Sequence, residues 1–164
     1  MKGKIFAVLA IGTIVIASCK KVEPTPATNP GTATIKGTLW ANLNTHNDTN
    51  QSGGYLLKSE YVPAGTKVTV IVNSYDLDAT PDGSYNYQDL KYTGVVGTAG
   101  DYSIANVPCY NTPINVEVYF NDFSYNKIWG PLAGDITPTV FTLGSVTLTI
   151  YDGAIVIHDA TYAG

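Results

Sequence analysis

Arginine is absent from this sequence of 164 residues, and only 13% of the residues are charged. All nine basic residues are lysines, and they form no cluster beyond Lys21. Nucleic-acid binding depends on clustered Lys and Arg that neutralise phosphates, and bidentate capture of phosphate needs the arginine fork. The sequence therefore predicts no nucleic-acid partner and argues against phosphorylated or polyanionic ligands.

Metal-ligating and nucleophilic residues are also scarce. The chain has two histidines and two cysteines, and Cys109 is the cysteine outside the N-terminal region. A structural zinc site uses four N or S ligands, and a catalytic site uses about three. No G-x-S-x-G nucleophile elbow occurs. We expect no metal site, no cofactor, no catalytic residue and no enzymatic activity.

The best alternative is a calcium loop, because Asp76, Asp78 and Asp82 lie close together in sequence and calcium prefers oxygen ligands. Pro81 disrupts the EF-hand spacing, however, and no glutamate closes the loop. A solvated Asp/Pro/Gly turn is the better interpretation.

The N-terminus has two lysines followed by an uncharged run of 13 residues, Ile5 to Ala17. A membrane-spanning helix needs about 20 residues, so this run is typical of a signal peptide. Ile16-Ala17-Ser18-Cys19 resembles the bacterial lipobox, in which the cysteine thiol receives a diacylglycerol and the peptide is cut before it. Residues 1–18 are therefore the expected signal peptide, and Cys19 is the expected lipidated residue.

Residues 19–32 contain Pro24, Pro26 and Pro30 among small polar residues, a composition that cannot build a core. We expect an extended tether that reaches at most about 50 Å. Lys20-Lys21 is unlike the aspartate of lipoproteins retained in the inner membrane, which favours the outer membrane but leaves its leaflet open.

Residues 33–164 have the size of one domain and show period-2 alternation, which is typical of strands. The clearest case is Thr66–Asn73, with Val68, Val70 and Val72 pointing inward. The pattern predicts an antiparallel two-sheet sandwich of about seven or eight strands. It also predicts a hairpin of Leu90–Val96 with Tyr102–Ala105, a turn at 106–109, an irregular segment at 123–136, and a closing meander of Thr139–Phe141, Val146–Tyr151 and Ala154–His158.

The segment from Thr98 through Gly100, Tyr102, Ile104 and Val107 to Pro108 resembles a motif of carboxypeptidase-regulatory-like, transthyretin-like and related Cna-B-type sandwich domains. Ile35-Lys36-Gly37-Thr38 is similar to the first strand of the same group. The resemblance implies a transthyretin-like (prealbumin-like) sandwich and a non-catalytic module that spaces, stiffens or binds at cell surfaces.

Twelve tyrosines and two tryptophans are numerous for this length. Five of these rings are candidates for ligand binding: Trp40 on an outward strand face, and Tyr85, Tyr87, Tyr125 and Trp129 in loops. Aromatic rings also favour strands and pack at sandwich edges, so the same residues have a structural explanation. We expect a lipid-anchored accessory, adhesion or protein-interaction module at the outer membrane. The alternative is a carbohydrate-binding surface lipoprotein that uses the loop aromatics.

Overall fold

A computed structural model describes residues 30–48, 54, 56–129 and 135–164 of the chain. The predicted signal peptide, Cys19 and most of the predicted tether lie outside these residues. The described residues form no α-helix, and none of them belongs to a helix long and apolar enough to cross a membrane. Their elements are β1 (Gly31–Ala41), η1 (Thr45–Asn47), β2 (Glu60–Tyr61), β3 (Lys67–Asn73), η2 (Ser74–Leu77), β4 (Asp89–Val95), β5 (Asp101–Cys109), β6 (Ile114–Phe120), β7 (Phe123–Trp129), β8 (Asp135–Phe141), β9 (Gly144–Ile150), β10 (Ile155–Ile157) and β11 (Ala160–Tyr162).

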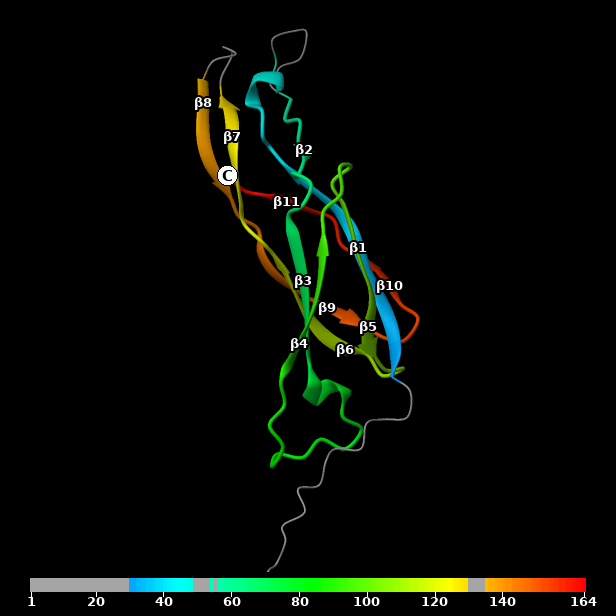
Figure 1. Cartoon of the computed structure of the whole chain (residues 1–164). Helices are drawn as coiled ribbons and strands as arrows, with labels where there is room; N and C mark the ends of the chain where they lie inside the picture. Colours follow the sequence, from blue (N-terminus) through cyan, green and yellow to red (C-terminus); the bar gives the residue numbers. More distant parts are fainter. Residues whose placement is uncertain (1–29, 49–53, 55, 130–134) are drawn as a thin grey trace, which may run out of the picture.

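Two main sheets build the molecule, as predicted (Figure 1). The first is organised around β1, which pairs antiparallel with β5 and β2 and parallel with β10 and β11. The second has the order β4-β3-β6-β9 and is antiparallel throughout. The all-β prediction is confirmed, whereas the expectation of about seven or eight strands, all antiparallel, is wrong. The first strand, β1, already includes Gly31 and Thr32.

The core lies between the sheets and follows the predicted alternation. In β3, Val68, Val70 and Val72 are completely buried, as Val116 and Val118 are in β6. The first sheet contributes further buried apolar side chains: Ile35, Leu39, Tyr102, Ile104 and Val107. Because successive strand residues point to opposite faces, the other face of the second sheet presents polar side chains such as those of Thr69 and Thr93, which share a 3.0 Å hydrogen bond. The core is built entirely from residues that follow Thr32.

The predicted hairpin between β4 and β5 is wrong, because these strands belong to different sheets: β4 pairs with β3, and β5 pairs with β1. The turn at Gly97–Gly100 instead carries the chain across the core, and Gly100 adopts a φ of 71° there. A Cβ on Gly94 would lie 2.9 Å from Cγ1 of Ile104, so the two strands approach each other face to face. A glycine turn between two alternating segments marks a reversal of the chain, but pairing and facing strands share that pattern.

The closing meander is wrong for the same reason. The turn at Asp152-Gly153 joins β9, which pairs with β6, to β10, which pairs with β1, so β9 and β10 do not form a hairpin. The turn at Leu143–Gly144 joins β8, which pairs with β7, to β9. The expected turn at residues 106–109 is replaced by a continuous β5 with a bulge, where Asn106 has a φ of 59°.

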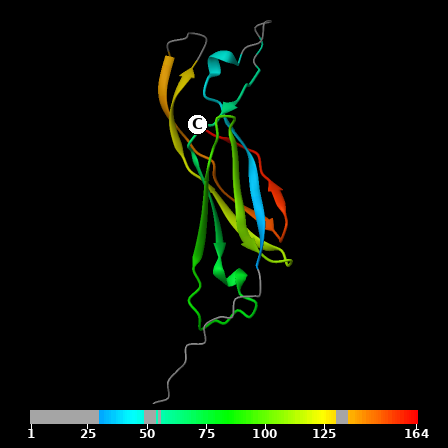
Figure 2. The ribbon, with the colours of Figure 1, turned by 45° about the vertical axis from the view of Figure 1, so that its right-hand side comes forward.

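The segment expected to be irregular, residues 123–136, contains β7 and the first residues of β8, and these two strands pair as an antiparallel ribbon. At its base, the rings of Phe123 and Phe141 stack with their centroids 5.1 Å apart. The apolar alternation of β7 is not recognisable in the sequence, because Lys127 is a charged residue at an inward-facing position and is only 4% exposed. Both views place the ribbon at one end of the molecule and the loop between β3 and β4 at the other (Figures 1 and 2).

Candidate functional site

The structure separates the five predicted aromatic candidates into three places. Trp40 is half-buried in β1, and Tyr85 and Tyr87 lie in the loop between η2 and β4, as expected. Tyr125 and Trp129 lie in strand β7 rather than in a loop. Because β7 and the β3–β4 loop occupy opposite ends of the molecule (Figure 1), the five residues do not form one binding site.

The tyrosine loop, defined here as residues 74–88, gathers three rings. Tyr75, which the sequence analysis missed, packs edge-to-face against Tyr87 with centroids 5.0 Å apart and an interplanar angle of 79°. Tyr85 packs against the same ring at 5.1 Å and 63°. The three rings are therefore not coplanar and do not form a flat stacking platform. Tyr75 is 51% exposed, so the cluster presents aromatic surface to solvent.

Side-chain hydrogen bonds fix the conformation of this loop. The Tyr87 hydroxyl donates to Oδ2 of Asp78 at 2.7 Å and accepts from the backbone N–H of Asp82 at 2.8 Å. Asp82 accepts in turn from the backbone N–H and the hydroxyl of Ser84, at 3.0 Å and 2.8 Å. Desolvation, and then the hydrogen bond to Asp78, raise the pKa of Tyr87, whereas the Ser84 N–H lowers the pKa of Asp82. The hydroxyl thus keeps the proton that it donates to Asp78, and hydrogen bonds between residues of the loop itself hold its conformation.

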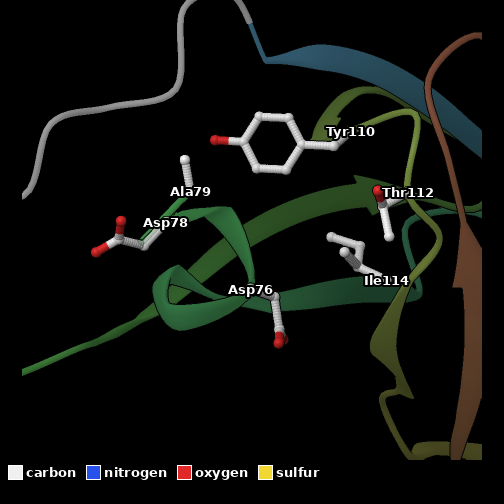
Figure 3. A pocket seen from close by; sticks show the side chains of 6 residues that line it. All are labelled: Asp76, Asp78, Ala79, Tyr110, Thr112 and Ile114. Atoms are coloured by element: carbon white, nitrogen blue, oxygen red, sulfur yellow. The ribbon is translucent and has the colours of Figure 1, made fainter. Parts of the chain in front are cut away.

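A pocket of about 370 Å³ opens beside the loop (Figure 3). The Tyr110 ring forms one wall, and the Tyr110 hydroxyl donates to the backbone oxygen of Leu77 in η2. Ile114 supplies an apolar surface, and Asp76 and Asp78 lie on the side of η2. The pocket therefore combines an aromatic wall with an acidic rim.

These carboxylates do not gather as metal ligands. Asp78 and Asp82 accept hydrogen bonds within the loop, including one from the backbone N–H of Thr80 to Asp78 at 2.9 Å. Among the described residues, no three His, Cys, Asp or Glu side chains come together in a way that could hold a metal ion.

A second group of aromatic residues lies on β7. Tyr125 and Trp129 are 41% and 42% exposed and share one face of the strand, about 13 Å apart at 3.3 Å per residue. Nζ of Lys127, between them, is 4.1 Å from the centroid of the Trp129 ring and donates to the Gly164 oxygen at 2.9 Å. An open depression of about 410 Å³ adjoins Tyr125, lined also by Ser124, Asn126 and Pro138.

The remaining cysteine lies in the core rather than in a site. Cys109 is completely buried and forms no disulfide. Burial, and then the charge of Asp152, raise the pKa of its thiol, whereas a nucleophilic cysteine requires a lowered pKa and access to solvent. The two histidines lie apart from it: His46 in η1, and His158 against the ring of Phe120 at 5.7 Å.

One polar cluster escaped the sequence analysis. Glu60 in β2 accepts hydrogen bonds from the backbone N–H groups of Leu43 and Asn44, at 2.8 Å and 3.2 Å, and from Nδ2 of Asn47 at 2.8 Å. The carboxylate supplies the hydrogen-bond acceptors that a neighbouring strand would otherwise supply after the end of β1. Glu60 therefore has a structural role. Sequence spacing does not reveal it, because the acceptor and the donors are about 16 residues apart.

No family model and no curated protein match this chain. Among solved structures, the chain is similar to the crystal structure of the major plantain pollen allergen Pla l 1, with 13% sequence identity and a TM-score of 0.32. The match covers 80% of this chain and 92% of the allergen chain.

Proposed function

We propose that this chain is a non-enzymatic lipoprotein, anchored through Cys19 in the outer membrane, that binds a protein partner through the tyrosine loop. The observation that carries the proposal is the loop itself, a rigid and exposed tyrosine cluster at one end of a β-sandwich. The proposed anchor rests on the lipobox-like sequence at residues 16–19.

The composition and rigidity of the loop support recognition of a protein. Residues 74–88 include three tyrosines, two serines, one glycine and one asparagine, the residue types that dominate the recognition loops of antibodies. Tyrosine offers a large contact area at a low cost in conformational entropy. The hydrogen bonds around Tyr87 order the loop before a partner arrives, which reduces the entropy lost on binding.

The proposal also includes the resemblance to transthyretin-like sandwich domains. The two segments that resemble carboxypeptidase-regulatory-like and transthyretin-like domains are direct neighbours in the first sheet, where Ile35 pairs with Ile104 and Gly37 with Tyr102. A sandwich of that group would serve as a rigid support, with the loop at its end making the contact.

A photocrosslinking residue at Tyr85 in the full chain, expressed in the native cell, tests the protein-binding role. Tyr119 is the matched control, since it is 41% exposed on the polar face of the second sheet and Tyr85 is 36% exposed. We expect a discrete protein adduct from position 85 and none from position 119. Equal adducts from both positions, or none from position 85, would contradict the proposal.

The alternative function, carbohydrate binding, has one observation in its favour: the rings of Tyr125 and Trp129 are 41% and 42% exposed, and Tyr125 lines an open depression. A glycan array probed with the lipid-free domain separates the two functions. Binding that Trp129→Ala removes would favour the carbohydrate function at β7. The Trp40→Ala variant serves as a comparison, because Trp40 lies in a different sheet.

A further inference from the structure

We propose that the pocket beside Tyr110 binds an alkylammonium group, that is, an ammonium carried by a short aliphatic chain. A lysine side chain of another protein and a free aliphatic amine share this chemistry. The inference goes beyond the proposed function and does not rest on it, because the pocket is lined by residues other than the exposed Tyr75 and Tyr85.

The aromatic wall of the pocket is fixed at both ends of Tyr110. The hydroxyl donates to the backbone oxygen of Leu77, and the backbone oxygen of Tyr110 accepts from the N–H of Asp152 at 2.8 Å. Leu77 belongs to η2, the short helix that also carries Asp76. The ring and the acidic rim are therefore tied to each other before a ligand arrives, which lowers the cost of binding.

The apolar lining suits an aliphatic chain. Figure 3 shows the Tyr110 ring, Ala79 and the Ile114 side chain around one opening. An alkylammonium can lay its methylene groups along such a surface while the charged head stays near water. The face of an aromatic ring also attracts an ammonium within about 6 Å of its centroid. The volume of about 370 Å³ is that of a small-molecule site.

The acidic rim favours a cation. Asp78 already accepts hydrogen bonds within the tyrosine loop, whereas the half-buried carboxylate of Asp76 has no hydrogen bond or ion pair within the described part of the chain. Between residues 74 and 89 the chain has four aspartates and no basic residue, and residues 110–114, which supply the rest of the lining, carry no charge. An ammonium in the pocket would supply the partner that Asp76 lacks.

An NMR titration of the mature chain 19–164 carrying Cys19→Ser tests this site with n-pentylamine, which is an ammonium at pH 7. We expect saturable shifts at the amides of Ala79, Thr112 and Ile114 and none at Thr147, on the polar face of β9. Pentylammonium should bind at least about fivefold more tightly than n-pentanol, the combined effect of an ion pair and a cation–π contact. Equal binding of the alcohol, or no saturable shift at the pocket amides, would overturn the proposal.

Two aspartate variants show whether the pocket itself selects the charge. Asp76→Asn should weaken pentylammonium binding by about two- to fivefold, as for a partly exposed ion pair, and leave n-pentanol binding unchanged. Asp89→Asn is the matched control, because it removes one charge from the same acidic segment, where Asp89 accepts from Nδ2 of Asn73 at 3.0 Å and does not line the pocket. Equal effects of the two variants would contradict a site built around Asp76.

Two further probes separate the sources of the ammonium. Cadaverine is a free diamine, whereas α-N-acetyl-lysine methylamide carries the backbone of a polypeptide, and both should compete with pentylammonium. Tighter binding of the blocked lysine would identify a protein side chain as the ligand, and tighter binding of cadaverine would identify a free amine. Failure of both to compete would overturn the proposal.

Discussion

Two buried tyrosines should make the sandwich sensitive to alkali. Burial, followed by the charge of Asp159, raises the pKa of Tyr102 to about 12, and burial, followed by Asp122, raises the pKa of Tyr162 to about 12. The unfolded pKa is about 10, so the unfolded chain loses these protons first. The stability contributed by each group is fully present below pH 10 and is lost as the pH rises towards 12.

The magnitude follows from linkage. A difference of about two pH units corresponds to about 2.7 kcal/mol for each tyrosine once both states are ionised. At pH 11 about half of this is lost, so the two residues together should reduce the free energy of unfolding by about 2.7 kcal/mol. Urea unfolding at a series of pH values from 8 to 11 measures this loss directly.

The double variant Tyr102→Phe/Tyr162→Phe isolates these two groups. At pH 8 it loses two hydrogen bonds, to the backbone oxygens of His158 at 2.9 Å and Asn121 at 3.0 Å, at about 1 kcal/mol each. Since the variant has no such protons to lose, its stability curve should cross that of the wild type between about pH 10 and pH 11. Tyr151→Phe, at a 51% exposed position, is the control. Parallel curves for the wild type and the double variant would refute the reasoning.

Three further predictions concern the core, the polar cluster and the loop. Cys109 should resist iodoacetamide in the folded domain and react fully in urea, as mass spectrometry would show; rapid labelling without denaturant would contradict its burial. Glu60→Ala should lower the free energy of unfolding by about 2–4 kcal/mol, because it leaves backbone N–H groups at residues 43–44 without their acceptor, whereas Glu60→Gln should cost less; equal losses in urea unfolding would contradict this. Tyr87→Phe should speed hydrogen exchange at the Asp82 amide without changing the melting temperature, and unchanged exchange would show that the hydroxyl does not order the loop.

Much of the fold could be predicted from local patterns. The alternation in β3 identified its buried face correctly, because one face of the strand meets the core. The pairing of strands could not be predicted in the same way. A Gly-containing turn such as Gly97–Gly100 has the same local chemistry whether its flanking strands pair or face each other across the core. The parallel pairing of β10 and β11 with β1 depends on residues more than 100 positions apart.

The candidate site was only partly accessible from the sequence. Tyr85 and Tyr87 could be identified from the composition of the loop. Tyr75 could not, because it joins them through a 3-10 helix that the sequence of residues 74–77 does not predict. The pocket escaped prediction because its wall, Tyr110, comes from a different segment of the chain. The sequence predicts a loop around Trp129 because Lys127, a charged residue that faces inward, interrupts the apolar alternation of β7.

The proposed function depends on a domain held at the membrane, so attachment of lipid at Cys19 is the property to measure. Cells expressing the full chain are supplied with labelled palmitate, and the purified protein is compared with a Cys19→Ser variant. We expect label on the wild type, recovery of the wild type in the outer-membrane fraction, and no label on the variant. Label on the Cys19→Ser variant, or none on the wild type, would contradict the proposed attachment.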